Sequence, residues 1–167
     1  QLVPGRQYIL KPVWEDGSLG ITEDSVFKYD GTAPAILKDK NDLHWFIEDF
    51  IDGREFNVSV KAGPDGPEVL PPAEMTFNGY PEDMPRIVSW KAKWEEDTFQ
   101  YDNSKRYFPD DLSERLKENI REAVLSCWEV FGLKGYARVD MRVDADENVY
   151  VLEVNANPCI SPDSGFI

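Results

Sequence analysis

Residues 136–143 read YARVDMRV and residues 149–155 read VYVLEVN, and these two short runs decide the fold of the chain. Apolar and polar side chains mostly alternate in both, which is the period of a strand that turns one face toward a core. The residues between the runs, Ala145-Asp146-Glu147-Asn148, are rich in turn-forming types. The sequence therefore predicts an antiparallel hairpin with a four-residue loop at 145–148.

The position of this loop determines which side chains lie opposite one another. Paired residues of an antiparallel ladder share a face, so Asp140 is expected opposite Glu153, and Arg138 opposite Asn155, on the same face. The remaining expected pairs are Arg142 with Val151 on that face, and Val139, Met141 and Val143 with Val154, Leu152 and Tyr150 on the opposite, apolar face.

The pairing of Asp140 with Glu153 points to a bound cation. Like charges directly opposite each other destabilise a sheet, and a divalent ion would remove the repulsion. Two carboxylates with the amide oxygen of Asn155 form a hard-oxygen set that suits magnesium, and Arg138 beside them could bind a phosphate oxygen. Taken alone, the pattern also fits a solvated face whose charges keep the hairpin soluble.

A long amphipathic helix precedes the hairpin. The sequence predicts it over residues 111–131, begun by a capping box of Asp111 with Glu114 and ended by Gly132. Its apolar residues recur at steps of three and four, as one buried helix face requires. They are Leu112, Leu116, Ile120, Val124, Cys127, Trp128 and Phe131.

Shorter elements are expected in the first two thirds of the chain. Thr32 is expected to cap a helix that runs toward Asn41, and residues 78–110 are expected to form a long functional loop with some local structure. Strands are expected at residues 8–13, 21–27, 45–51, 55–60 and 68–77, with glycine-containing turns around residues 14–20, at 52–53 and at 63–67.

Composition narrows the class of protein. Of 167 residues, 18 are Lys or Arg and 32 are Asp or Glu, giving a formal charge of −14, which argues against duplex nucleic acid as a partner. Hydrophobic residues make up 41%, too many for a disordered acidic tail. No apolar run approaches the length needed to span a bilayer. The chain has two cysteines, Cys127 and Cys159, which are too few to predict a fold held together by disulfides. We expect a cytoplasmic protein that needs no membrane.

The residues after the hairpin add a second kind of information. Leu152-Glu153-Val154-Asn155-Ala156-Asn157-Pro158, with Gly135-Tyr136-Ala137-Arg138-Val139-Asp140 upstream, resembles the end of ATP-grasp enzymes, most of all the D-alanine–D-alanine ligase family. Three further motifs occur in the family's order: Lys11-Pro12 followed by Gly17-Ser18-Leu19-Gly20, then Ile47-Glu48-Asp49-Phe50-Ile51, then Gly53-Arg54-Glu55-Phe56. The resemblance implies an α+β ATP-grasp fold with mainly antiparallel sheets in two subdomains, residues 1–53 clamping the nucleotide and residues 54–167 carrying the metal site.

The resemblance also implies a nucleotide site. Lys11 and the loop of Ser18 would contact the phosphates of ATP, since backbone N–H groups of such loops bind anions. Glu48 would accept from the adenine amino group and Glu55 from the ribose hydroxyls, as carboxylates can. The other implied nucleotide contacts are the backbone of Asp49 and Ile51, together with Leu152.

The implied catalytic group comprises Lys93, which would reach the transferred phosphate, Arg138, which would stabilise the tetrahedral intermediate, and Ser164, which would contact a substrate carboxylate. Lys91 is an alternative to Lys93, because the loop around them matches the family poorly. Asp140, Glu153 and Asn155 match the family's ligands for magnesium or manganese. Cys159 stands where the family has glycine, which places the usual D-alanine chemistry in question.

The resemblance implies an ATP-dependent carboxylate–amine ligase that works through an acyl phosphate on small-molecule substrates. An ATP-binding regulatory or scaffold module of the same shape is the alternative, supported by Cys159 and by the lack of a counterpart to the domain that precedes this region in family members. A purely structural acidic domain would leave the joint occurrence of Lys11, Glu55 and Asp140 without a reason. The resemblance implies that a homodimer is possible, because relatives commonly pair, and the sequence leaves the oligomeric state open.

Overall fold

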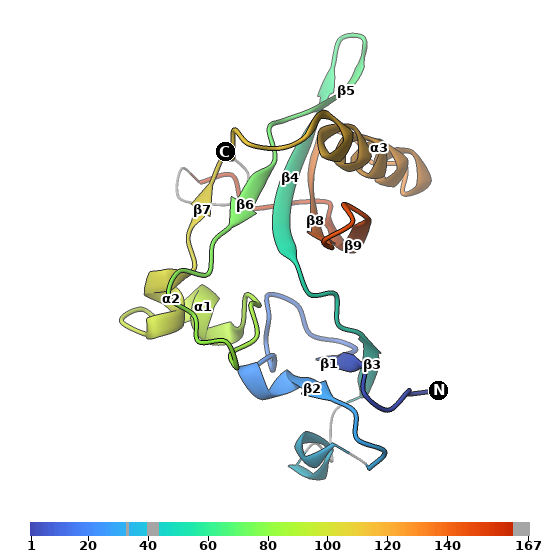
Figure 1. Ribbon diagram of the computed structural model, residues 1–167. Coiled ribbons are helices and arrows are strands. Elements are labelled where there is room, and N and C mark those ends of the chain that lie inside the picture. Colours follow the sequence, from blue (N-terminus) through green and yellow to red (C-terminus); the bar gives the residue numbers. More distant parts are fainter. Residues whose placement is uncertain (33, 40–43, 162–167) are drawn as a thin grey trace. The chain divides into compact units, whose positions relative to one another are not determined.

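The computed structural model describes residues 1–32, 34–39 and 44–161, and its chain divides into two compact units (Figure 1). The first unit comprises Gln1–Ile51 and Phe77–Lys105, and the second comprises Asp52–Thr76 and Arg106–Ile167. The division near residue 51 lies two residues from the boundary expected at 53. The segment Phe77–Lys105, which the sequence expectation assigned to the larger subdomain, belongs instead to the first unit.

An antiparallel sheet of three strands forms the centre of the first unit. Its order is β2-β1-β3, with β1 at Gln7–Pro12, β2 at Val26–Lys28 and β3 at Trp45–Asp49. The apolar side chains of β1 are buried, as expected for the central strand of a small sheet: Tyr8, Ile9 and Leu10.

Two expected elements of the first unit differ in the structure. Only the last part of the strand expected over residues 21–27 forms, as β2. The residues before it, Glu23–Ser25, form a 3-10 turn, η1, which is fixed by reciprocal hydrogen bonds between Thr22 and Ser25. The helix expected from Thr32 is wrong at its start, since Thr32 donates to the carboxylate of Asp30. The described part of that segment, Ala35–Asp39, is a 3-10 helix, η2, and residues 40–43 lie outside the described chain.

Two short helices occupy the stretch that the sequence assigned to a loop with local structure. They are α1 at Trp90–Trp94, capped by Ser89, and α2 at Phe99–Asn103, capped by Thr98. The aromatic ring of Tyr80 packs between Phe77 and Phe99, which ties α2 to the start of this segment.

The second unit contains an antiparallel sheet of six strands in the order β7-β6-β4-β8-β9, with β5 paired to β4. The single strand expected over residues 68–77 is instead two, β5 and β6, separated at Leu70-Pro71-Pro72, because proline cannot donate to a ladder. The strands are β4 at Arg54–Gly63, β5 at Gly66–Val69, β6 at Ala73–Met75, β7 at Arg106–Tyr107, β8 at Tyr136–Val143 and β9 at Val149–Asn155.

A helix covers the apolar face of this sheet and closes the core of the second unit. The helix, α3, spans Glu114–Val130 and lies beside β4, β8 and β9 (Figure 1). Side chains from α3, β4 and β8 are almost wholly excluded from solvent, so burial of apolar surface stabilises the packing. They include Leu116, Ile120 and Val124 of the helix and Phe56, Val58, Val60, Val139, Met141 and Val143 of the strands.

The ends of α3 differ in how well they were predicted. Gly132, with a φ of 59°, follows the helix and ends it as expected. The predicted capping box of Asp111 with Glu114 is wrong, because Ser113 is the N-cap and its hydroxyl accepts a 3.0 Å hydrogen bond from the Leu116 amide. The helix therefore begins three residues later than predicted.

The hairpin has the predicted strands, with a different register near its loop. Asp140 lies opposite Glu153, and Arg138 opposite Asn155, as predicted. A β-bulge follows, so that Met141 pairs with Val151 rather than with Leu152. Two further predicted pairs are corrected for the same reason: Arg142 lies opposite Tyr150 rather than Val151, and Val143 opposite Val149 rather than Tyr150.

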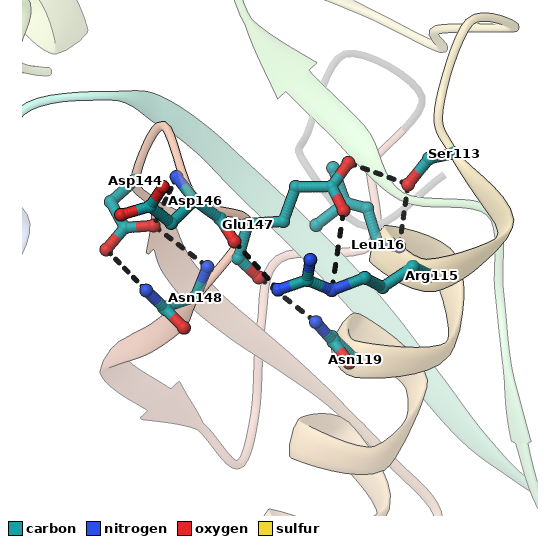
Figure 2. A network of polar contacts seen from close by, with 8 residues as sticks. All are labelled: Ser113, Arg115, Leu116, Asn119, Asp144, Asp146, Glu147 and Asn148. Atoms are coloured by element: carbon teal, nitrogen blue, oxygen red, sulfur yellow. Dashed lines mark hydrogen bonds and ion pairs between the residues drawn. The ribbon is translucent and has the colours of Figure 1, made fainter.

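Polar contacts fasten the hairpin loop to the start of α3 (Figure 2). The Ser113 hydroxyl donates to the Glu147 carboxylate at 2.7 Å, and Arg115 donates to the Asp146 carbonyl at 2.9 Å. Asn119 donates to the carbonyl of Glu147 at 3.1 Å. Within the loop, the Asp144 carboxylate accepts from the backbone amides of residues 146 and 148. The hairpin is thereby held at both its loop and its packed face.

Both cysteines are free thiols, Cys127 buried in α3 and Cys159 exposed. Among the described residues, no helix combines the length and the hydropathy that crossing a membrane would require.

Candidate functional site

One face of the sheet in the second unit packs under α3, and the opposite face is polar. The alternation along β4 and β8 sends their apolar side chains to the core and leaves charged and amide side chains on the other side. Neighbouring strands place these side chains opposite one another. Across β4 and β8 the pairs are Glu55 with Arg142, Asn57 with Asp140 and Ser59 with Arg138. Across β8 and β9 they are Asp140 with Glu153 and Arg138 with Asn155.

The three expected metal ligands lie together on this face. The side-chain amide nitrogen of Asn155 is 3.3 Å from a carboxylate oxygen of Asp140 and 3.0 Å from one of Glu153. One amide thus bridges both acids and offsets their repulsion. Turning that amide by 180° would present its oxygen at the same point, giving three oxygen ligands for a hard cation. The donor set therefore fits magnesium or manganese.

Among the described residues, no larger acidic or histidine cluster competes with this set. Within the part of the chain that the structure describes, no group of three or more His, Cys, Asp or Glu side chains is arranged to hold a metal ion. The candidate centre consequently depends on two carboxylates and an amide, with the rest of a coordination sphere left to waters or substrate oxygens.

Arg138 is bound to the candidate metal ligands. Its guanidinium donates two hydrogen bonds of 2.6 Å to the Asp140 carboxylate and lies 3.9 Å from Glu153. Burial raises the pKa of Asp140, the ion pair with Arg138 lowers it, and nearby Glu153 raises it again, leaving it above its ordinary value. Burial lowers the pKa of Arg138, but its bonds to Asp140 outweigh that effect and keep it charged.

Glu55 forms a second ion pair on the same face. Arg142 donates to the Glu55 carboxylate at 3.0 Å and to the carbonyl oxygen of Gly53 at 3.0 Å. Both side chains are buried, with relative exposures of 8% for Glu55 and 4% for Arg142. Sequence reasoning singled out Glu55 and missed Arg142, whose signal was an arginine inside an otherwise buried strand.

Lys11 and Glu48 lie together in the first unit. They stand on the adjacent strands β1 and β3 and form an ion pair through Nζ and Oε1. Asp49, next to Glu48, points to the other side of the strand and pairs with Arg6 at 3.6 Å on the surface. Ile51 follows the end of β3, where the chain passes into the second unit.

The glycine loop and the segment of Lys93 are also connected within the first unit. Ser18 has a φ of 68° and its hydroxyl donates to the Val88 carbonyl at 2.7 Å. The indole of Trp94 donates to the Gly17 carbonyl at 2.8 Å, and the ammonium of Lys93 lies 5.9 Å from the Trp94 ring centroid. The glycine loop is thus joined to the segment that carries Lys93, through Trp94 and Val88.

The remaining expected residues are Leu152, Cys159 and Ser164. Leu152 is the extra residue of the β-bulge and is about one-third exposed. Cys159 is exposed, with its sulfur 3.2 Å from the Ser161 hydroxyl. Ser164 lies outside the described residues. The metal set, Arg138 and Glu55 belong to the second unit, whereas Lys11, Ser18, Glu48 and Lys93 belong to the first.

A family model and curated relatives of this chain point to the same family. Residues 7–167 match the family model described as the D-ala D-ala ligase C-terminus. A D-alanine–D-alanine ligase of Pseudoalteromonas translucida is 32% identical over 166 residues, which cover 95% of this chain and 47% of that enzyme. A second, from Frankia casuarinae, is 31% identical over 164 residues, 97% of this chain and 40% of the enzyme. The chain spans about half the length of the curated relatives it matches.

Solved structures agree on the fold. The crystal structure of D-alanine–D-alanine ligase from Bacillus anthracis superposes with a TM-score of 0.66 at 23% identity, covering 96% of this chain and 47% of that one. The structure of that enzyme complexed with ATP gives a TM-score of 0.58 at 22% identity, over 97% of this chain and 52% of the other. These likenesses confirm the predicted α+β ATP-grasp fold.

Proposed function

Because this chain belongs to the family of D-alanine–D-alanine ligase C-termini, as its motifs predicted, we propose that it is the ATP- and metal-binding part of an ATP-dependent carboxylate–amine ligase. Its substrates would be small molecules, an amino acid or other carboxylate and an amine. The observation that supports this most directly is the group formed by Asp140, Glu153, Asn155 and Arg138 on one face of β8 and β9. A cytoplasmic location and a homodimer remain predictions.

The proposed reaction has two steps. A carboxylate oxygen of the first substrate attacks the γ-phosphorus of ATP, and ADP leaves. The amine nitrogen of the second substrate then attacks the carbonyl carbon of the acyl phosphate, loses a proton, and displaces inorganic phosphate as the amide bond forms. Neither step needs a nucleophile from the protein, so the residues contribute positioning and charge.

Each proposed residue has a defined part. Lys11 and the Ser18 loop would bind the ATP phosphates, and Lys93 would neutralise the transferred one. Arg138, already directed at Asp140, would stabilise negative charge on the tetrahedral intermediate. The remaining proposed contacts are Glu48 with adenine, Glu55 with the ribose, the backbone of Asp49 and Ile51 with Leu152 around the base, and Ser164 with a substrate carboxylate.

Asp140, Glu153 and Asn155 would hold magnesium, or manganese, through oxygen atoms. The metal, when bound, supplies positive charge that neutralises the nucleotide's phosphates. ATP itself is a natural choice of ligand for the chain, since the Bacillus anthracis ligase of the same fold was solved complexed with ATP.

The test is calorimetric titration of the 167-residue chain with ATP, in magnesium and in EDTA. We expect binding in magnesium that Asp140→Asn weakens at least tenfold, because a ligand that coordinates the metal loses its charge. Asp146→Asn is the matched control, since it removes the same charge from an exposed position in the same hairpin. Equal weakening by both variants, or no binding at all, would contradict the proposal.

A second measurement separates ligation from nucleotide binding alone. Phosphate release from ATP is followed while candidate amino acids are added. Release that rises with an amino acid supports the ligase, whereas binding of ATP without such release would favour the alternative, an ATP-binding module of the same shape.

A further inference from the structure

The guanidinium of Arg142 is one of the most deeply buried charges in the described chain. It lies in β8 with a relative exposure of 4%, two residues from Asp140 along the same strand. Burial lowers its pKa while Glu55 and Asp52 raise it, yet an arginine stays charged in proteins. A buried charge must be paired, and the identity of its partners therefore indicates what it does.

Two partners of this guanidinium lie where the chain enters β4. One guanidinium nitrogen donates to the carboxylate of Glu55 at 3.0 Å and another to the carbonyl oxygen of Gly53 at 3.0 Å. The next residue of β8, Val143, also lies against this point, since a β-carbon on Gly53 would lie 2.0 Å from its carbonyl oxygen. The backbone before Glu55 and the carboxylate of Glu55 are thus both fixed to β8.

We propose that Arg142 is a positioning residue of the nucleotide site, which directs the Glu55 carboxylate toward the ribose hydroxyls of ATP. This inference rests on the proposed function, because the contact of Glu55 with the ribose belongs to it. Arg142 acts through Glu55 and touches no part of the nucleotide. A carboxylate has about four acceptor sites, so one bond from Arg142 is compatible with hydroxyl donors on the others.

The planar fork of arginine is what this role requires. Two of its nitrogens reach two acceptors at fixed separation, whereas a lysine ammonium is a single point on a flexible stem. Methionine has a similar volume and no charge, so it would leave Glu55 buried without its cationic partner. The Glu55 carboxylate would then turn or take up a proton, and its orientation for a ribose hydroxyl would be lost.

The test compares two nucleotides that differ only in the ribose hydroxyls. Binding of ATP and of 2′,3′-dideoxy-ATP is measured in magnesium by calorimetry, for the wild-type chain, Arg142→Met and Glu55→Gln. We expect the wild type to prefer ATP, and both variants to lose most of that preference. ATP affinity should fall about tenfold or more, as for a lost hydrogen bond to a charged group, with dideoxy-ATP affinity within about twofold.

Two further variants make the result specific. Arg54→Met is the matched control, since it breaks another ion pair of the same sheet, with Glu74 at 2.5 Å, and should keep the preference for ATP. In the double variant Glu55→Gln/Arg142→Met, the second change should add no further loss of ATP affinity, because the two residues act as one unit.

The possible outcomes are distinguishable. Failure of the wild type to bind either nucleotide would overturn the proposed function and this inference together. Binding by the wild type with an unchanged preference in Arg142→Met would overturn only the positioning role, as would equal weakening of both nucleotides. If Arg142→Met does not fold, Arg142→Lys decides in its place: a reduced preference supports the role of Arg142, and an unchanged one overturns it.

Discussion

The α-carbon of Gly53 lies against the carbonyl oxygen of Val143, so closely that a β-carbon there would lie 2.0 Å from the oxygen and 3.0 Å from the carbonyl carbon. Gly53 also has a φ of 154°, a conformation that L side chains rarely adopt. The entrance to β4 therefore requires glycine for two independent reasons.

Replacing Gly53 with alanine should destabilise the second unit severely. Backbone strain alone costs about 1–3 kcal/mol, and the collision with Val143 adds to it. Gly66→Ala is the control, because Gly66 has a φ of 134° with open space around its α-carbon. Urea unfolding followed by circular dichroism should give a clearly larger loss for Gly53→Ala, and equal losses would argue against the close approach.

Replacing Ser113 with alanine should weaken α3 and its attachment to the hairpin loop. The variant loses the cap of the Leu116 amide and the bond to Glu147, so we expect a loss of about 1–2 kcal/mol in the free energy of unfolding. Asp111→Ala, at the position that the sequence pattern favoured, should cost less than about 1 kcal/mol, as it removes a surface pair with Arg54. The reverse order would restore Asp111 as the cap.

Replacing Asn155 with aspartate should make stability depend on divalent ions. The change removes the donor that bridges Asp140 and Glu153 and adds a third negative charge, so without metal we expect a loss of about 1–3 kcal/mol. Magnesium should restore more stability to this variant than to Asn157→Asp, whose oxygen can still accept from Tyr136. Thermal unfolding with and without magnesium measures this, and equal recovery in both would contradict a cation site at the cluster.

Replacing Asp144 with asparagine should remove a pH-dependent part of the stability. Hydrogen bonds from Asn148, the Asp146 amide and Tyr150 hold the pKa of Asp144 below its ordinary value. A lowered pKa stabilises the fold above the ordinary aspartate range, near pH 4, and that stabilisation disappears as pH falls through the folded-state value. The wild type should exceed the variant in unfolding free energy at pH 7, and the difference should shrink in acid.

The same variant has a spectroscopic signature. In the wild type, the Tyr150 hydroxyl donates a hydrogen bond to the Asp144 carboxylate. This bond raises the pKa of Tyr150, because the charged carboxylate favours the protonated phenol. Asp144→Asn should therefore lower that pKa, which ultraviolet titration of tyrosinate can detect. An unchanged titration would show that the hydroxyl and the carboxylate are not bonded in solution.

The hairpin could be predicted from sequence because its information is local. Alternation along β8 and β9 determined both strands and the pairing of Asp140 with Glu153. The bulge was not predicted, since Val151 and Leu152 are both apolar and the expected register was counted from the loop alone. The cap of α3 was misassigned because Asp111 and Ser113 are both good capping residues, and the contact of Ser113 with Glu147 that favours it is distant in sequence.

The pairing of strands distant in sequence also limited the prediction of the candidate site. Lys11 and Glu48 were both identified, but their ion pair depends on β1 lying beside β3. Arg142 was assigned to face Val151 but lies opposite Tyr150, and its ion-pair partner Glu55 comes from β4, 87 residues earlier. Residue types can suggest which side chains belong to a site. Which side chains pair with one another depends on the order of the strands in the sheet, and short sequence motifs do not encode that order.

The bulge at Leu152 divides the hairpin into two halves of different register. On one side, the acids and the amide keep a regular ladder from Arg138 to Asp140. On the other, the register is offset by one residue up to the loop. The extra residue is accommodated between these halves, so the loop can keep its contacts with α3 while Glu153 stays on the same face as Asp140.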